Sequence, residues 1–104
     1  MQVTTRTPGQ ELAVSGAVDL TSVADLRAAL REALAAGVGD LRLDCSGLTC
    51  SDATGLGVLL STHRRAQRLD RRLVLTGVPA PLRRLLVVSR LSRVLALQDA
   101  SSAA

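Results

Sequence analysis

The sequence contains no phenylalanine, tyrosine or tryptophan, and all thirteen basic residues among its 104 are arginine. Without aromatic side chains, the core has to be built from leucine, valine and alanine. The absence of lysine excludes the P-loop with its phosphate-binding lysine, a pyridoxal Schiff base and a kinase fold that depends on a strand lysine. A response-regulator receiver domain, which also uses a lysine, is disfavoured for the same reason.

Histidine and cysteine are scarce as well, with one histidine and two cysteines. We expect neither a zinc site, which usually needs four protein ligands, nor any other cofactor. Cys45 and Cys50 lack the C-x-x-C spacing of redox motifs, so we expect reduced thiols that pack as small apolar groups. His63 is expected to be a packed or edge residue of a helix. No paired carboxylates or nucleophile–base motif suggests an enzyme.

Long apolar runs are also missing. Residues 1–20 contain no signal-peptide segment, and no later run is long enough to span a bilayer. We therefore expect a cytoplasmic protein without membrane insertion. The net charge of +4 suggests nucleic-acid binding. Binding of single strands, however, needs aromatic side chains on which bases stack, and the chain has none. A GC-rich coding sequence alone would also favour arginine over lysine. We expect no nucleic-acid partner, and a nucleic-acid-binding domain is the weakest of three hypotheses.

The length predicts one domain. Two short strands, residues 3–6 and 12–14, form a hairpin around Pro8-Gly9. The pattern Ser22-Val23-Ala24-Asp25 resembles a capping box and begins a helix that Gly37 and Gly39 end. Its apolar stripe is Val23, Leu26, Leu30, Ala33 and Leu34.

A strand over residues 41–45 and a loop over 46–51 lead to a second helix. This helix begins near Asp52 or Ala53 and ends near Arg68. Its apolar positions are Leu56, Val58, Leu59, Leu60 and Ala66. Arginines crowd its C-terminal end and the residues beyond it, where cations stabilise the negative end of the helix dipole: Arg64, Arg65, Arg68, Arg71 and Arg72.

The remaining chain predicts a buried strand over residues 73–76 and a helix opened by Pro79 and Pro81. The inner face of this helix is Leu82, Leu85 and Leu86, with Val88 as a further candidate. A break at 89–93 precedes a last strand at 94–97, and residues 99–104 form a frayed tail. The order β-β-α-β-α-β-α-β predicts an α/β domain with a mixed sheet and helices mainly on one face.

The most informative segment is D-A-T-G-L-G at residues 52–57, where a helix starts after a strand and a loop. Unpaired backbone N–H groups and the helix dipole stabilise an anion there. Gly55 and Gly57 weaken the helix, but their lack of a side chain lets another backbone approach closely. Thr54 adds a hydroxyl at this turn.

This segment resembles the signature of the STAS family, the anti-sigma factor antagonists of bacterial partner-switching systems. The family's L-x-L-D-x-S/D-G strand and D-S-S/T-G-L-G helix start match residues 41–47 and 52–57. The pieces G-A-V-D at 16–19 and L-T-G-V at 75–78 also agree. The resemblance implies a STAS domain over residues 2–98.

The resemblance further implies a non-enzymatic switch. In the family, the unmodified antagonist binds an anti-sigma factor that is also an ATP-dependent serine/threonine kinase, and so frees a sigma factor. Phosphorylation breaks this complex, and a PP2C-type phosphatase restores it. By position the phosphoacceptor is Thr54, with Ser51 as the fallback because Ala53 replaces a usual hydroxyl residue. The interface candidates are Asp19, Asp52, Ala53, Gly55, Leu56 and Gly57.

Other interpretations of these residues stay open. Thr54 could be a helix-capping hydroxyl without a regulatory role, and Asp19 and Asp52 could cap the first and second helices. The second functional hypothesis is a STAS subunit of an ABC lipid transporter or of a stress-sensing assembly, in which the domain acts as a binding scaffold.

Overall fold

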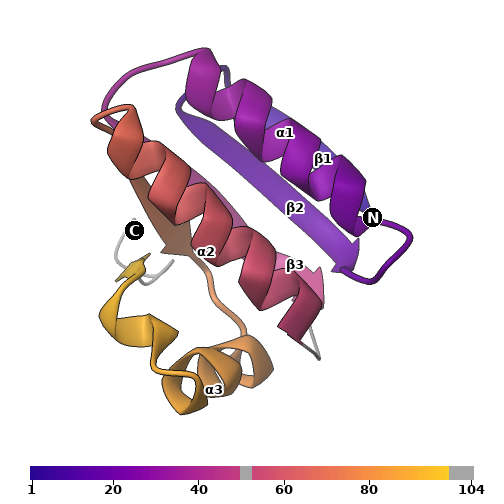
Figure 1. The fold of residues 1–104 in the computed structure, drawn as a ribbon. Helices are drawn as coiled ribbons and strands as arrows, with labels where there is room; N and C mark the ends of the chain where they lie inside the picture. Colours follow the sequence, from indigo (N-terminus) through magenta and orange to yellow (C-terminus); the bar gives the residue numbers. More distant parts are fainter. Residues whose placement is uncertain (50–52, 99–104) are drawn as a thin grey trace.

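The strands of this chain form one five-stranded sheet in the order β1-β2-β3-β4-β5 (Figure 1). The computed structural model describes residues 1–49 and 53–98. Its elements are β1 (Gln2–Thr7), β2 (Glu11–Ala17), α1 (Val23–Ala35), β3 (Asp40–Thr49), α2 (Ala53–Arg68), β4 (Arg72–Thr76), α3 (Ala80–Val88), the 3-10 helix η1 (Leu91–Arg93) and β5 (Ala96–Gln98). The predicted order of strands and helices is confirmed.

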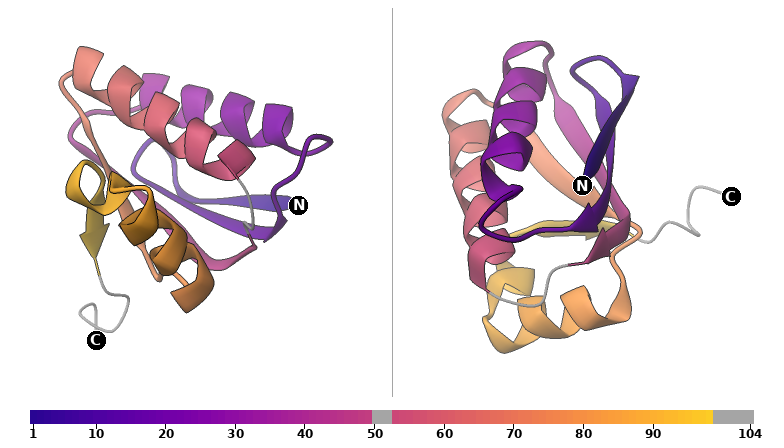
Figure 2. Two further views of the ribbon diagram at one scale, coloured as in Figure 1. Left: turned by 60° about the horizontal axis from the view of Figure 1, so that its bottom comes forward. Right: turned by 90° about the vertical axis from the view of Figure 1, so that its right-hand side faces the viewer.

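Only the first hairpin is antiparallel: β1 pairs with β2, and the pairs β2–β3, β3–β4 and β4–β5 are parallel. Strands that follow one another in the chain are also neighbours in the sheet. Right-handed crossovers therefore put successive helices on the same face. Figure 2 shows α1 and α2 side by side on that face, with α3 at the carboxyl end of β4. The predicted mixed sheet with one main helical face is confirmed.

The core lies between this face of the sheet and the helices, and it consists of leucine, valine, alanine and one cysteine. On β3, Leu41, Leu43 and Cys45 alternate with outward-facing residues and are fully buried. The apolar stripe of α1 is buried as its spacing predicts. The expected apolar role of Cys45 is confirmed, and Cys50 lies outside the described residues.

The third strand is longer than the sequence predicts. β3 continues to Thr49, so most of the loop expected at residues 46–51 is strand. The reason is pairing with β2, because Gly47, Leu48 and Thr49 lie opposite the last three residues of that strand after an irregularity in the register. Pairing with a distant segment thus extends a stretch that reads locally as a turn.

Two predictions near the C-terminus are wrong. Val88 is 82% exposed, because α3 turns Leu82 and Leu86 toward the core and leaves its last turn outside. The last strand covers residues 96–98 instead of 94–97. It starts later because the backbone N–H of Leu95 donates to Leu91 at 2.8 Å and closes a turn after η1. The predicted tail at residues 99–104 lies outside the described residues.

The arginines after α2 do not act as expected. Arg71 is only 5% exposed, and its guanidinium donates to backbone carbonyls from three segments that meet there. The acceptors are Gly39 at 3.0 Å, Ala33 at 3.0 Å, Leu34 at 2.9 Å, Asp40 at 3.4 Å and Gly9. Ala33 and Leu34 lie in the last turn of α1, where helix carbonyls run short of backbone donors, and the Ala33 carbonyl also accepts the Ala36 N–H at 3.3 Å. Arg71 therefore caps α1 instead of stabilising the end of α2.

Arg72 is likewise engaged elsewhere, since it binds Asp40 with an Nη2–Oδ2 distance of 2.7 Å. Only Arg65 and Arg68 remain in the last turn of α2, where the dipole argument applies.

Candidate partner-binding site

The predicted site residues are positioned by the carboxyl ends of the parallel strands, which share one edge of the sheet. Ala17 at the end of β2 lies opposite Thr49 at the end of β3, and the N–H of Val18 donates to the Thr49 carbonyl at 2.9 Å. The loop that holds Asp19 and the start of α2 therefore lie at the same edge (Figure 1). In open α/β sheets this edge is the usual place for binding sites.

Asp19 organises the loop before α1. Its Oδ1 accepts hydrogen bonds from the Thr21 N–H at 2.9 Å, the Thr21 hydroxyl at 2.6 Å and the Ser22 N–H at 3.1 Å. The Thr21 hydroxyl lowers the pKa of Asp19 most, and the backbone N–H groups add to the effect despite a small degree of desolvation. The carboxylate thus satisfies N–H groups of the loop just before the helix, whereas the N-cap residue of α1 is Ser22.

The capping box predicted at residues 22–25 is wrong. Ser22 is the N-cap residue of α1, but its side chain makes no capping hydrogen bond to the helix. Its hydroxyl instead donates back to the Ala17 carbonyl at 2.9 Å, which fastens the loop to the end of β2. Because Asp19 already holds this turn, the serine is available for that second task.

Leu20, which directly follows Asp19, is not predicted as a site residue from the sequence. Leu20 is 84% exposed, in a loop whose other apolar residue, Val18, is buried. A single exposed leucine is ordinary on a protein surface. At an edge that also carries the start of α2, it becomes an interface candidate, and an apolar residue inside a short polar loop is the signal that could have identified it.

Thr54 is the second residue of α2, and its side chain is half-buried. This position lies inside the helix, whereas an N-cap residue precedes the first helical residue. Ala53 begins the helix. Ser51 and Asp52 lie outside the described residues, so the capping role considered for Asp52 stays a prediction.

The two glycines that follow differ in their surroundings. Gly55 and Leu56 are buried, whereas Gly57 is exposed, and a Cβ built on Gly57 would meet nothing within 4 Å. The packing of the described chain therefore does not require a glycine at position 57. Gly57 weakens the helix without a packing reason, and its lack of a side chain would let the backbone of a partner approach closely.

The edge also contains a hollow of about 560 Å³ beside the last residues of β3. Its lining comes from the end of β3 and the start of α3: Ser46, Gly47, Leu48, Thr49, Pro79, Pro81, Leu82, Arg84 and Leu85. The sequence does not predict that α3 lies at this site. The spacing of its leucines shows which face of the helix is buried, but not which other segment lies beside it.

The signature residue Asp44 makes an ion pair and a hydrogen bond within the sheet. Its carboxylate pairs with Arg6 at 2.7 Å and accepts the Ser46 N–H at 2.9 Å. Burial alone would raise the pKa of Asp44, but the hydrogen bonds from Ser46 and the ion pair with Arg6 outweigh it and lower the pKa. Arg6 also binds Glu11 at 3.3 Å, so these groups join β1, β2 and β3.

The remaining candidates for chemistry form no reactive cluster. The Nδ1 atom of His63 is buried without a hydrogen-bond partner among the described residues, and the side chain is half-buried, as expected for a packed residue. Across residues 1–49 and 53–98, no group of three or more His, Cys, Asp or Glu side chains could hold a metal ion. In the same part of the chain, no helix combines the length and apolarity needed to cross a membrane.

Comparison with known proteins agrees with this architecture. The family model described as Mlab, STAS domain, matches residues 2–98, and the chain belongs to the STAS-domain family. The fold is similar to that of the anti-sigma factor antagonist SpoIIAA in its unphosphorylated form, with a TM-score of 0.74 and 22% sequence identity over 95% of this chain and 86% of that chain.

A second similar structure is that of the Bacillus cell fate determinant SpoIIAA in the phosphorylated form. Its TM-score is 0.72 and its sequence identity 22%, over 95% of this chain and 89% of that chain. No protein with a curated description matches the chain. At this identity the two structures establish a shared fold, and the family model confirms the family that residues 41–57 indicated.

Proposed function

We propose that this STAS domain is a cytoplasmic anti-sigma factor antagonist that acts by binding and not by catalysis. In its unphosphorylated form it binds an anti-sigma factor that is also a serine/threonine kinase, and a sigma factor is released. Phosphorylation of Thr54 breaks the complex, and a PP2C-type phosphatase reverses the modification. The structural neighbour SpoIIAA is described in both an unphosphorylated and a phosphorylated form, which supports this choice.

The observation that carries the proposal is the position of the Thr54 hydroxyl. It lies in the first turn of α2, at the sheet edge shared with Asp19 and three residues before the exposed Gly57. A phosphate adds about −1.5 to −2 charge at neutral pH. The N-terminal end of a helix tolerates this charge, so the free domain keeps its fold. In a closed interface the same charge has to be desolvated, and the complex is weakened.

The test is a titration of the purified anti-sigma kinase, loaded with ADP, with three variants of the full chain. Thr54→Ala is expected to bind as tightly as the wild type. Thr54→Glu is expected to bind at least tenfold more weakly. Gln67→Glu is the matched control, because it adds the same charge to an exposed position near the other end of α2. Equal affinities for Thr54→Glu and Gln67→Glu would remove Thr54 from the switch.

The second candidate function is that of a binding scaffold in an ABC lipid transporter or a stress-sensing assembly. It is favoured by the family match itself, because the matching model carries the name Mlab and not that of the antagonist. Affinity capture from host lysate, with Thr54→Ala and Thr54→Glu as baits, separates the two. A small ATP-binding anti-sigma kinase recovered by the alanine bait alone supports the switch, whereas a transporter ATPase recovered by both baits supports the scaffold.

A further inference from the structure

A groove between α1 and α2, which we call the arginine groove, lies at a distance from the proposed switch. It has a volume of about 290 Å³. Eight residues line it: Arg27, Arg31, Leu34, Ser61, Thr62, Arg64, Arg65 and Arg68. Arg65 lies eleven residues after Thr54 on α2, which corresponds to about 16 Å along the helix axis. The groove can therefore be tested independently of Thr54.

Among the residues that the structure describes, no acidic side chain pairs with the positive charge of this groove. Five of the lining residues are arginines and none is acidic. Within residues 1–49 and 53–98, the ion pairs of Arg6, Arg42 and Arg72 lie on the sheet, and none of them involves an arginine of the groove. α2 contains no acidic residue, and Glu32 of α1 lines a hollow on the other flank of that helix. Like charges so close together repel one another and favour a bound anion.

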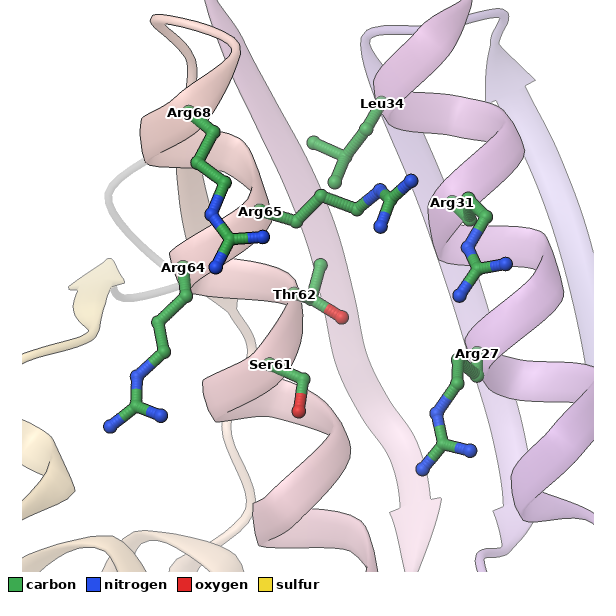
Figure 3. Close-up of a pocket in the computed structure, with 8 residues that line it drawn as sticks. All are labelled: Arg27, Arg31, Leu34, Ser61, Thr62, Arg64, Arg65 and Arg68. Atoms are coloured by element: carbon green, nitrogen blue, oxygen red, sulfur yellow. The ribbon is translucent and has the colours of Figure 1, made fainter.

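The geometry brings three of these arginines, Arg27, Arg31 and Arg65, to the space between the helices (Figure 3). Arg27 and Arg31 are one helical turn apart on α1, and Figure 3 shows both side chains extending toward the space between the helices. Arg65 reaches across from α2 toward Arg31, and the exposed Ser61 adds a hydroxyl on the same side. Guanidinium groups form planar, two-pronged hydrogen bonds that match phosphate oxygens.

We propose that the arginine groove binds a ligand that carries two or more phosphate groups. A single phosphate would leave most of the five arginines uncompensated, whereas linked phosphates can contact arginines of both helices at once. A typical protein interface buries about 800 Å² on each partner around apolar anchors. Leu34 is the one apolar residue among the eight that line the groove, so the groove offers little to anchor such a partner.

The first test is calorimetric titration of the full chain with tripolyphosphate at low ionic strength. The double variant Arg31→Gln/Arg65→Gln is expected to lower the association constant at least tenfold. The double variant Arg90→Gln/Arg93→Gln removes the same charge from exposed positions outside the groove, and a change of less than twofold is expected. An equal loss in both double variants, or binding of citrate as tight as that of tripolyphosphate, would overturn the proposal.

The second test identifies the source of the phosphates. Cardiolipin carries two phosphate groups, so vesicles that contain it are compared with vesicles of phosphatidylcholine in a sedimentation assay. Groove-dependent binding of tripolyphosphate supports a soluble ligand, and groove-dependent binding of cardiolipin vesicles alone supports a lipid headgroup. If neither phosphate probe binds wild-type protein, the proposal fails. Groove-dependent binding of a short DNA duplex alone would also overturn it.

Discussion

The replacement of Arg71 by methionine should be among the most damaging single changes in this domain. Methionine keeps an unbranched side chain, shorter than that of arginine, and removes every donor, so the carbonyls that the guanidinium contacts lose this donor. Gly39 and Asp40 are exposed and can turn to water. Ala33 and Leu34 are buried, and their carbonyls lie in the last turn of α1.

The expected loss follows from those buried groups. The buried carbonyls of Leu34 and Gly9 lose the guanidinium, whereas the Ala33 carbonyl keeps the Ala36 N–H at 3.3 Å. Because a buried carbonyl without a partner costs about 1–3 kcal/mol, the two give an expected loss of about 2–5 kcal/mol. Domains of this kind have a total stability of about 5–15 kcal/mol, so the variant should be close to unfolding. Arg71→Lys keeps the charge but offers three donors on a single nitrogen, and about half of the loss is expected.

The assay is urea unfolding followed by far-ultraviolet circular dichroism, because the chain has no tryptophan or tyrosine for fluorescence. Arg72→Met is the matched control, since its ion pair with Asp40 lies on the surface, and a loss of at most about 1 kcal/mol is expected. If Arg71→Met unfolds with the same midpoint as Arg72→Met, Arg71 does not cap α1. If Arg71→Met does not fold, the midpoint of Arg71→Lys decides between the same two outcomes.

Two further predictions concern the site edge and the sheet. Gly57→Ala should raise the free energy of unfolding by up to about 1 kcal/mol, because the added Cβ would meet nothing within 4 Å. The same change should weaken partner binding at least tenfold. Unchanged affinity would show that no partner approaches this residue. Asp44→Asn should lower the free energy of unfolding near neutral pH by about 1 kcal/mol. Because the folded-state pKa of Asp44 is lowered, its stabilisation is present above the unfolded-state value and is lost as pH falls through the folded-state value. The variant and wild-type unfolding curves should therefore converge in acid, and a constant difference from about pH 6 to pH 2 would contradict the assignment.

The sequence alone predicts the order of the elements because each has a local signature. Apolar residues recur at helical spacing in residues 23–34, and glycines or prolines separate the elements. The contribution of Arg71 has no such signature, because its acceptors are backbone carbonyls 31 to 62 residues away, which every residue type possesses. The length of β3 was missed for a similar reason, since its last residues are strand only through their pairing with β2.

The candidate site also contains some residues that a local sequence pattern predicts and others that only the fold brings together. A short motif reveals Thr54 and Gly57, but no local pattern shows that Leu20 and the start of α3 lie at the same edge. The arginine groove is the extreme case. Its arginines are visible in the sequence, yet Arg31 and Arg65 face each other only because two consecutive crossovers place α1 and α2 side by side on one face.

The two ends of α2 differ in expected stability. Its first turns contain glycines, and the rest of the helix contains buried apolar residues. In the proposed switch, a kinase has to reach Thr54, whose side chain is half-buried. Glycines at positions 55 and 57 reduce the intrinsic stability of the first turns by about 1 kcal/mol each relative to alanine, which makes local opening easier there. Farther along, Val58, Leu59 and Ala66 are almost fully buried and hold the rest of the helix on the sheet. In the proposed switch, local opening of the first turn would expose Thr54 to the kinase while the rest of the helix stays packed on the sheet, and replacing the glycines with alanine would work against that access.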